Sequence, residues 1–512
     1  MATTQLVLQW LELKGEIFFR PISLALVIFS FSLLVLRRYI SRNKAEESKL
    51  PPSPPRLPII GNLHQLGELA YRSFRDLSNK YGPVVFLYLG QAPTIVISSP
   101  ELAIEVLKTQ DLQFANRPFT TAAKALLYGC IDVGFAPYGE YWRQIRKICV
   151  VELLSIKRVQ SFKFVREQEV SLMIEQISLS CSQQTPVNLS EMILTLSNDI
   201  LTMCALGTKG EGESGRARFG ELSREAMRLL GVFSFGDFFP YFGWIDVLTG
   251  FVGTLKKVSK ELDIFFEQVI EKHLVEKKKD DDKKDLLDLL LQAQIDNNLQ
   301  RENIKAILMD MFVGGTDTTS TVIEWAIAEL IRNPKVMKKT QEEVRRVVGR
   351  KSKVEEEDIH QLDYLNCVIK ETLRLHAPVP TLVPRVPSES TIINGYHIPP
   401  GTRVFVNVWA IQRDSNIWIN AEEFIPERFS NNPIDHKGQC YEYMPFGSGR
   451  RGCPGISFGL AVVEFVLANL LYSFDWELAD GGKMEELDMS EAFGLTVNKK
   501  VPLQLIPKLY SF

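Results

Sequence analysis

The chain has 512 residues, of which 45% are hydrophobic and 24% are charged, and its formal net charge is −3. This composition predicts a large folded core and excludes a disordered chain, and the near-neutral charge without a basic stripe gives no sign of nucleic-acid binding. The seven cysteines form no CxxC pair and are odd in number, so we expect neither a disulfide framework nor a zinc site.

The N-terminal region carries the first recognisable element. Residues 21–36, PISLALVIFSFSLLVL, contain no charge, and four basic residues follow at 37, 38, 42 and 44. An uncharged helix of that length rises roughly 24 Å, so spanning a bilayer needs a few more residues on the side of Arg20, whose long side chain reaches the interface. We expect an uncleaved membrane anchor over residues 1–44, with the remaining chain on the cytosolic side. A cleaved signal peptide is the alternative, but the charges follow the apolar run and no small-residue cleavage site is present.

Residues 45–62 contain the stretch KLPPSPPRLPIIGN, whose closely spaced prolines exclude helix and favour a stiff, extended hinge. The remaining chain, 63–512, reads as one catalytic domain that is mainly α with a minor β part. Gly82-Pro83 ends the first amphipathic helix of this domain, and Asn-Gly and Pro-Gly turns separate short strands within 390–411. We expect a hairpin at 84–90 and 93–98, a solvated charge run at 276–285, and helices at 71–82, 100–110, 138–147, 262–274, 284–294, 304–331 and 456–474.

Cys453 lies in the stretch PFGSGRRGCPG, residues 445–455, at the start of the last apolar helix. A free cysteine is usually a small apolar core residue. Here four glycines allow close approach of the backbone to a flat ligand, two arginines precede the thiol, and amide donors of the helix N-terminus favour a thiolate. The stretch therefore predicts an anionic cysteine that acts as a redox nucleophile or as a metal ligand.

The sequence GGTDTT, residues 314–319, interrupts an otherwise apolar helix. Two adjacent glycines cost about 2 kcal/mol relative to alanine, so the interruption needs an explanation. One is a kinked core helix whose threonines bond back to the preceding turn. The other is a functional groove in which Asp317 and Thr318 handle protons.

Two further pairs have helical spacing. Glu371 and Arg374 are three residues apart in ETLRLHAPVP, and alone they are equally consistent with an ordinary surface ion pair. Trp142 and Arg146 are four apart in YGEYWRQIRK, and alone they are equally consistent with a surface helix that buries one tryptophan.

These motifs together resemble those of the cytochromes P450, and the resemblance extends over the whole chain. Phe446, Gly449, Arg451, Cys453 and Gly455 match the haem-ligand pattern FxxGxRxCxG of that family. The resemblance implies a cytochrome P450 fold with an N-terminal transmembrane helix. It implies haem b with Cys453 as the axial ligand of the iron, which favours O–O cleavage.

The resemblance also assigns roles to the other motifs. Asp317 and Thr318 would deliver protons to dioxygen. Glu371, Arg374 and Arg428 would form a structural triad behind the cysteine segment. The remaining cofactor contacts would come from Phe446 and Gly455 in the cysteine loop and from propionate partners, namely Trp142, Arg146, Arg385 and Arg451.

The substrate pocket implied by position in the family is almost entirely apolar, which predicts a lipophilic small molecule, although several members could be plain core residues. Its candidates are Phe119, Leu126, Ile307, Met311, Phe312, Val379, Leu382, Val383, Phe493 and Leu495. The aromatic segment 233–251 is either a membrane-facing entrance or ordinary packing.

The anchor, hinge and loop details resemble the plant A-type enzymes of specialised metabolism, which sit in the endoplasmic reticulum membrane and receive NADPH electrons from a reductase. Basic residues that would contact an acidic reductase domain are Arg143, Lys147, Lys157 and Arg158. The expected activity is monooxygenation of a terpenoid or alkaloid. A reductase-independent haem-thiolate isomerase or dehydratase is the alternative, and a haem-binding scaffold without turnover is the third.

Overall fold

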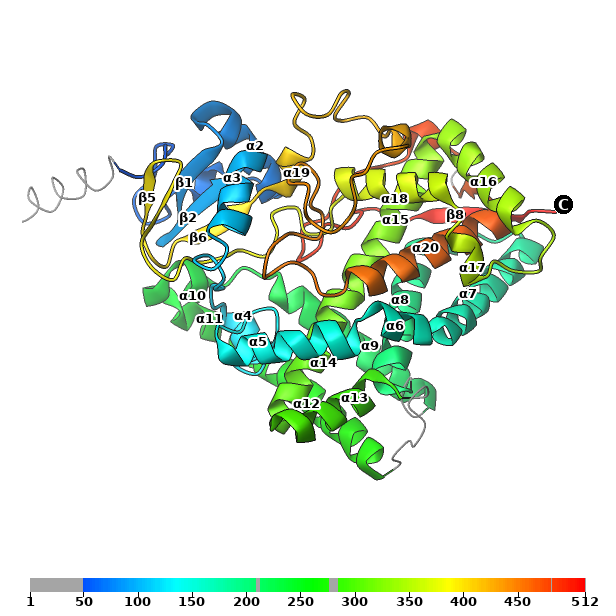
Figure 1. Cartoon of the computed structure of the whole chain (residues 1–512), viewed down its shortest axis with the longest axis horizontal. Coiled ribbons are helices and arrows are strands. Elements are labelled where there is room, and N and C mark those ends of the chain that lie inside the picture. The colour runs from blue at the N-terminus through cyan, green and yellow to red at the C-terminus, as the bar shows by residue number, and fades with distance from the viewer. Residues whose placement is uncertain (1–48, 209–211, 276–283, 480, 512) are drawn as a thin grey trace, which may run out of the picture.

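The computed structural model describes residues 49–208, 212–275, 284–479 and 481–511, and the predicted anchor of residues 1–44 lies outside them. Figure 1 shows a large helical body with a small β region at one end, next to the start of the described chain. The fold is mainly α with a minor β part, as predicted. Its longer helices are α2 Ala70–Tyr81, α5 Glu140–Lys147, α7 Lys163–Gln183, α8 Leu189–Leu206, α9 Gly212–Leu230, α12 Phe251–Val275, α13 Leu286–Asn297, α14 Arg301–Gly315, α15 Asp317–Arg332, α16 Pro334–Val348, α18 Asp363–Leu375 and α20 Ile456–Ser473.

Short helices connect these elements. They are α3 Pro100–Ile104, α4 Thr121–Leu126, α6 Ile156–Ser161, α10 Phe235–Phe238, α11 Trp244–Leu248, α17 Glu356–Ile359 and α19 Val408–Ile411. The 3-10 turns are η1 Leu63–Gln65, η4 Pro240–Phe242, η6 Pro426–Phe429 and η7 Met484–Glu486, and the π-helical turns are η2 Glu105–Thr109 and η3 Ile148–Leu153. The helix predicted over 100–110 is thus α3 followed by η2.

The β part consists of three small sheets. In the first, β1 Val84–Leu89 pairs antiparallel with β2 Ala92–Ile97, and β2 pairs parallel with β6 Arg403–Val406. Gly90 makes the tight turn of the predicted hairpin with a φ of 62°. β4 Thr391–Ile393 and β5 Tyr396–Ile398 form the second sheet across Asn394-Gly395, and the third has the order β3 Val187–Asn188, β8 Gln504–Leu509 and β7 Phe474–Leu478.

The strand pattern expected through residue 411 ends at Val406, because α19 follows. The Asn407 side chain accepts a hydrogen bond from Ala410 N at 3.2 Å and caps this short helix. Such a cap satisfies a backbone donor locally, so the apolar residues that follow coil instead of extending.

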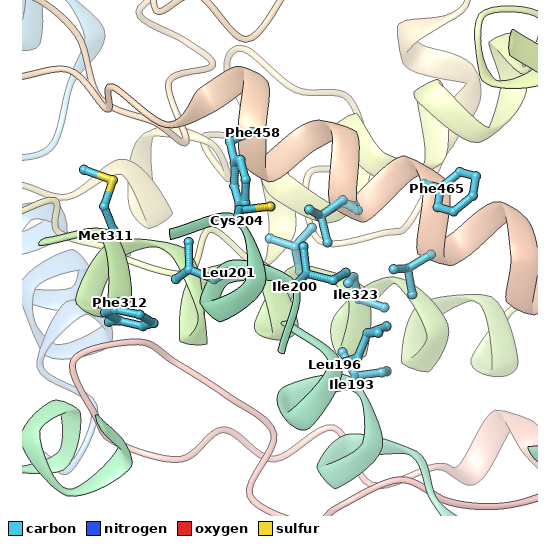
Figure 2. Close-up of a cluster of buried hydrophobic side chains, with 14 of the residues drawn as sticks. Ile193, Leu196, Ile200, Leu201, Cys204, Met311, Phe312, Ile323, Phe458 and Phe465 are labelled. Carbon is cyan, nitrogen blue, oxygen red and sulfur yellow. The ribbon is translucent and has the colours of Figure 1, made fainter. Parts of the chain in front are cut away.

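The core is built around α15, which packs against α8, α18 and α20. Figure 2 shows apolar side chains of α8, including Ile193, Leu196 and Ile200, in one cluster with those of α14, α15 and α20. Two described helices, α8 and α20, are long and apolar enough to cross a membrane, but both are mostly buried in this core. They are therefore core helices by position.

The helix predicted over 304–331 is two helices, because the backbone breaks at Thr316 between α14 and α15. The Thr318 hydroxyl donates to the carbonyl oxygen of Gly314 at 2.6 Å. A side chain that bonds back to the preceding turn competes with the backbone ladder and bends the helix. The kink and a functional groove are thus compatible readings of the same sequence.

Candidate functional site

The loop that carries Cys453 is fixed by its own backbone and by its glycines. Cys453 N donates to the carbonyl oxygen of Phe446 at 3.0 Å, and Gly447 and Gly449 both have a φ of 69°. A Cβ at Gly449 would collide with the carbonyl oxygen of Leu107 and with the Asp111 carboxyl, so only glycine fits there. The loop therefore presents the thiol from a closely packed turn at the N-terminus of α20.

Cys453 is the one exposed cysteine of the seven. Gly455 N donates to its Sγ at 3.3 Å, and this hydrogen bond together with the Arg146 charge lowers the pKa of the thiol. Desolvation by the surrounding protein is the largest effect, however, and it raises the pKa above the ordinary value. The thiol alone is thus neutral near pH 7, which disfavours the redox nucleophile, whereas a bound metal cation would deprotonate it outright.

Four arginines lie near the cysteine loop with their guanidinium groups largely inside the protein: Arg117, Arg146, Arg385 and Arg451. Burial lowers the pKa of all four guanidinium groups. Repulsion from neighbouring arginines lowers the pKa of Arg117 and Arg451 further, and the pKa of Arg451 falls to about 10. Arg385 Nη1 pairs with Asp111 Oδ1 at 2.6 Å, and the described residues offer no ion-pair partner within 4.0 Å to the other three. An excess of buried positive charge is costly unless an anion compensates it.

This arginine cluster and the cysteine are the basis for testing the haem that the sequence resemblance implies. A haem carries two propionates, and arginine binds carboxylates in a fixed fork geometry. One accessible thiol can bind the iron, and several guanidinium groups without enough protein counter-charge can bind the two propionates. This set of residues therefore fits a haem. Arg117 was not among the sequence candidates, since the triplet Asn-Arg-Pro gives no signal without its tertiary neighbours.

The predicted propionate partners are brought together, but several of their donors bond to the protein backbone. Trp142 Nε1 donates to the carbonyl oxygen of Val133 at 2.9 Å, and the Arg451 guanidinium lies 4.3 Å from the centre of the Trp142 ring. Arg146 Nη2 donates to the carbonyl oxygen of Gly452, next to the cysteine, at 2.5 Å. Arg385 Nη2 donates to that of Ser448 at 2.8 Å.

Glu371, Arg374 and Arg428 form a buried cluster behind the loop. Arg374 donates to both Glu371 oxygens at 2.7 and 2.9 Å, and Arg428 Nε donates to Glu371 Oε1 at 2.9 Å. The side chains of Glu371 and Arg374 are fully buried. Arg374 Nη1 also donates to the carbonyl oxygen of Gln412, whose side-chain Oε1 accepts from Met444 N at 3.0 Å. Hydrogen bonds thus run continuously from α18 to the first residues of the cysteine loop.

Asp317 and Thr318 begin α15 and face different surroundings. Thr496 Oγ1 donates to Asp317 Oδ2, and Asn498 Nδ2 lies 3.5 Å from Oδ1, so loop 492–498 holds the carboxylate. Asp317 also lines a cavity of about 450 Å³ between α8, α9 and that loop. The buried hydroxyl of Thr316 lines the same cavity and has no hydrogen-bond partner in the described part of the protein. The sequence analysis placed Phe493 and Leu495 of this loop in the substrate pocket but did not predict that Thr496 and Asn498 contact Asp317.

The substrate-pocket candidates divide into three groups. Leu126, Ile307, Met311 and Phe312 are buried, Phe119 and Phe493 are exposed, and Val379, Leu382, Val383 and Leu495 are half-buried. Phe312 packs against Phe219 at a ring distance of 4.7 Å, within an aromatic core cluster. Figure 2 shows Met311 and Phe312 leaving α14 in different directions. Phe493 and Leu495 line the cavity beside Asp317.

Comparison with known proteins identifies the family. The Cytochrome P450 family model matches residues 51–506. Cytochrome P450 71A1 of Persea americana is 57% identical over 88% of this chain and 91% of its own length. Phenylacetaldehyde oxime monooxygenase of Prunus mume is 49% identical over 97% of this chain and 95% of its own length. Desmethylyatein synthase of Sinopodophyllum hexandrum is 49% identical over 94% of this chain and 97% of its own length.

Solved structures agree with this at the level of the fold. A zebrafish cytochrome P450 with progesterone superposes with a TM-score of 0.73 at 23% identity, covering 86% of this chain and 99% of that protein. Because the family model spans nearly all described residues and the relatives are close to full length, the chain belongs to the cytochrome P450 family.

Proposed function

We propose that the protein is a monooxygenase that inserts one oxygen atom of dioxygen into a lipophilic small molecule with electrons from NADPH. The cofactor is haem b, with dioxygen as co-substrate. The observation that carries the proposal is the accessible Cys453 thiol beside buried arginines that lack enough protein counter-charge. Cys453 would bind the iron, and Arg117, Arg146, Arg385 and Arg451 would hold the haem carboxylates.

The bound haem supplies the oxygen-activating redox chemistry, and the chain supplies protons and positioning. The Thr318 hydroxyl donates a hydrogen bond to the carbonyl oxygen of Gly314 and would act as a local proton donor. Asp317, in the wall of the cavity, would exchange protons with water and pass them to that region. This pair supports oxygen insertion over the isomerase or dehydratase alternative, which requires no proton delivery to dioxygen.

The proposed substrate is lipophilic, because the candidate pocket offers almost only apolar side chains. Apolar pockets discriminate by shape, and a few polar groups would suffice to orient the molecule. We propose a terpenoid or an alkaloid of plant specialised metabolism. The related Prunus mume enzyme is named for an aldoxime, so this choice requires a panel that also covers aromatic nitrogen compounds and phenolics.

The proposed electron donor is an NADPH–cytochrome P450 reductase that docks near the cysteine loop. Arg143 and Lys147 are exposed on α5, the helix that also carries Arg146. Lys157 is exposed on α6 and Arg158 follows it. A basic surface of this kind suits an acidic reductase domain and would give salt-dependent reduction.

The proposed location is the endoplasmic reticulum membrane, with one N-terminal span and the catalytic domain in the cytosol. We define the aromatic patch as the exposed side chains Phe233, Tyr241, Phe242, Trp244, Val247 and Leu248 around α10 and α11. Gln91 N donates to the carbonyl oxygen of Phe238, and Gly90 N donates to that of Ile60, itself partly exposed. Figure 1 places α10 and α11 at the end of the molecule where the described chain starts. A contiguous apolar surface beside the hinge is typical of membrane contact.

Turnover tests the proposal directly. The full-length protein is incubated with a plant reductase, with and without NADPH, on a panel of terpenoids, alkaloids, aldoximes and phenolics. We expect a product heavier by one oxygen atom that forms only with NADPH. Conversion without NADPH would instead establish the isomerase or dehydratase, and Asp317 and Thr318 would then need another role.

A further inference from the structure

One buried and one half-buried carboxyl group lie near the candidate site and belong to none of its motifs. Asp132 lies in the loop between α4 and α5 and is fully buried, and Asp310 lies on α14, one turn before Gly314. Asp310 Oδ2 accepts from Val133 N at 2.5 Å, and Asp132 Oδ2 accepts from Phe135 N at 2.8 Å. The two side chains therefore hold the same short backbone segment, residues 132–136, from either side.

The two carboxyls lie next to each other beside Gly134. A Cβ at Gly134 would lie 3.0 Å from Asp132 Oδ2 and 3.3 Å from Asp310 Oδ1. No basic side chain in the described parts of the chain lies within 4.0 Å of either group, and Asp132 Oδ1 is buried without a conventional donor. Two carboxylates cannot hydrogen bond to each other, whereas a protonated carboxyl can donate to an ionised one. A single shared proton would therefore allow the two carboxyls to hydrogen bond to each other.

The electrostatic surroundings identify Asp310 as the protonated partner. Burial raises the pKa of both carboxyls, the Asp132 charge raises the pKa of Asp310 well above its ordinary value, and the hydrogen bond from Asp310 lowers the pKa of Asp132. The other titratable groups facing the pair come from several elements and include both signs. They are Arg117, Cys130, Tyr141, Arg146, Cys149 and Arg451. The positive members favour one remaining negative charge on the pair.

The carbonyl groups of the same segment bind the candidate haem partners. Val133 O accepts from Trp142 Nε1 at 2.9 Å and from Arg451 Nη1 at 3.1 Å. Gly134 O accepts from Arg117 Nε at 3.2 Å, and Ala136 O accepts from Arg451 Nη2 at 2.5 Å. The amides of Val133 and Phe135 thus bond to the carboxyl pair, and the carbonyl groups of residues 133, 134 and 136 bond to Trp142 and two arginines.

We propose that Asp132 and Asp310 share one proton and form a positioning pair, which fixes residues 132–136 to α14 and thereby orients Trp142, Arg117 and Arg451 toward the haem carboxylates. This inference rests on the proposed role of those three residues. The pair itself touches neither the substrate nor the reacting atoms. It acts through the backbone segment alone.

The proposal has a defined pH dependence. An unfolded carboxyl loses its proton near pH 4, whereas the folded pKa of Asp310 is raised. The stabilisation from the shared proton is therefore complete in acid and is lost as pH rises through the raised pKa. Above that pH both carboxyls are ionised, they repel, and residues 132–136 should loosen.

Hydrogen exchange of the amides of residues 133–136, corrected for intrinsic rates, tests the pair in the full-length haem-loaded protein. Haem transfer to apomyoglobin is measured in parallel. We expect wild-type protection to fall with rising pH. Asp310→Asn keeps a side-chain donor that cannot ionise, so its protection and haem retention should stay near wild type at low pH and become independent of pH. Asp310→Leu removes the donor and should speed both amide exchange and haem transfer about tenfold at low pH. The difference from wild type should shrink above the raised pKa, where the wild-type pair is itself loosened.

Two further variants keep the test decisive if Asp310→Leu folds poorly. Gly134→Ala places a methyl group against both carboxyls and should loosen the same amides. Asp246→Asn is the matched control. Asp246 is also buried and also accepts from two backbone amides, Phe235 N and Gly236 N, but it lies in a different part of the protein. It should leave haem transfer unchanged.

The proposal is overturned if Asp310→Asn keeps the wild-type pH dependence, or if Asp310→Leu and Gly134→Ala leave the amides of residues 133–136 protected. A failure of the proposed function would be seen separately, as absence of haem binding or of NADPH-dependent turnover in the wild-type protein.

Discussion

Asp317 accepts its hydrogen bonds from Thr496 and Asn498, which lie about 180 residues later in the sequence, near the C-terminus. Its neighbour Thr318 instead bonds to the carbonyl oxygen of Gly314 in the last turn of α14. The acid is therefore held by a loop, while the alcohol is held by the helix itself. Thr496 therefore fixes the position of the Asp317 carboxylate, and the motif of residues 314–319 does not reveal this contact.

We predict that Thr496→Val lowers the yield of oxygenated product per NADPH about tenfold. Without the Thr496 hydroxyl, the Asp317 carboxylate is no longer held in place and transfers protons less efficiently. Thr496→Ser keeps the hydroxyl and should restore most of the yield. Product and hydrogen peroxide are measured against NADPH consumed. Equal yields in wild type and Thr496→Val would show that the loop only packs against Asp317.

Cys453 illustrates a second effect at this scale. The helix N-terminus predicted an anionic thiol, yet desolvation dominates and raises its pKa. The sequence shows the favourable amide donors but not the depth of the protein around them. A thiolate at Cys453 would thus depend on a bound metal cation more than on the helix.

At the scale of secondary-structure elements, α18 and the cysteine loop are joined by buried polar contacts instead of apolar packing alone. Glu371 accepts from Arg374, Arg428 and also Ile425 N at 2.8 Å. Removing one partner from such a cluster leaves a buried charge uncompensated, which costs more than the contact itself is worth.

Glu371→Gln should therefore lower the free energy of unfolding by about 3–5 kcal/mol and reduce haem incorporation. The matched control is Lys339→Gln, because Lys339 pairs with Glu427 at 2.8 Å but about half of each side chain is exposed. That change should cost at most about 1 kcal/mol. Denaturant unfolding of both variants checks the difference, and equal destabilisation would show that the cluster gains nothing from its burial.

At the scale of the whole molecule, the aromatic patch, residues 49–62 of the hinge and the β1–β2 turn lie at one end of the body (Figure 1). Trp244, Leu248 and Tyr241 are more than half exposed there. The same surface would be a liability in water and is favourable against lipid.

We predict that Trp244 contacts the bilayer in the full-length protein. Brominated lipids should quench part of the tryptophan fluorescence in vesicles, and Trp244→Phe should remove a measurable share of that quenching. Trp476→Phe is the control, because Trp476 is 4% exposed and lies in β7. Quenching unaffected by Trp244→Phe would place the patch in water or against protein.

The sequence by itself determined the mainly α fold, the hairpin at β1–β2, the position of Cys453 ahead of α20 and the family. These features depend on periodicity, on glycine at strained or crowded positions and on short motifs, all of which are local. It also showed that Glu371 and Arg374 share a helix face.

Only the tertiary structure decided the break at Thr316, the helix α19, the raised pKa of Cys453 and the place of Phe312 in the aromatic core. The same holds for the contacts of Arg117, Thr496, Asp132 and Asp310. Each of these depends on groups far apart along the chain that desolvate, repel or hydrogen bond to one another. Such effects follow distance in space, and the order of residues does not encode that distance until the chain has folded.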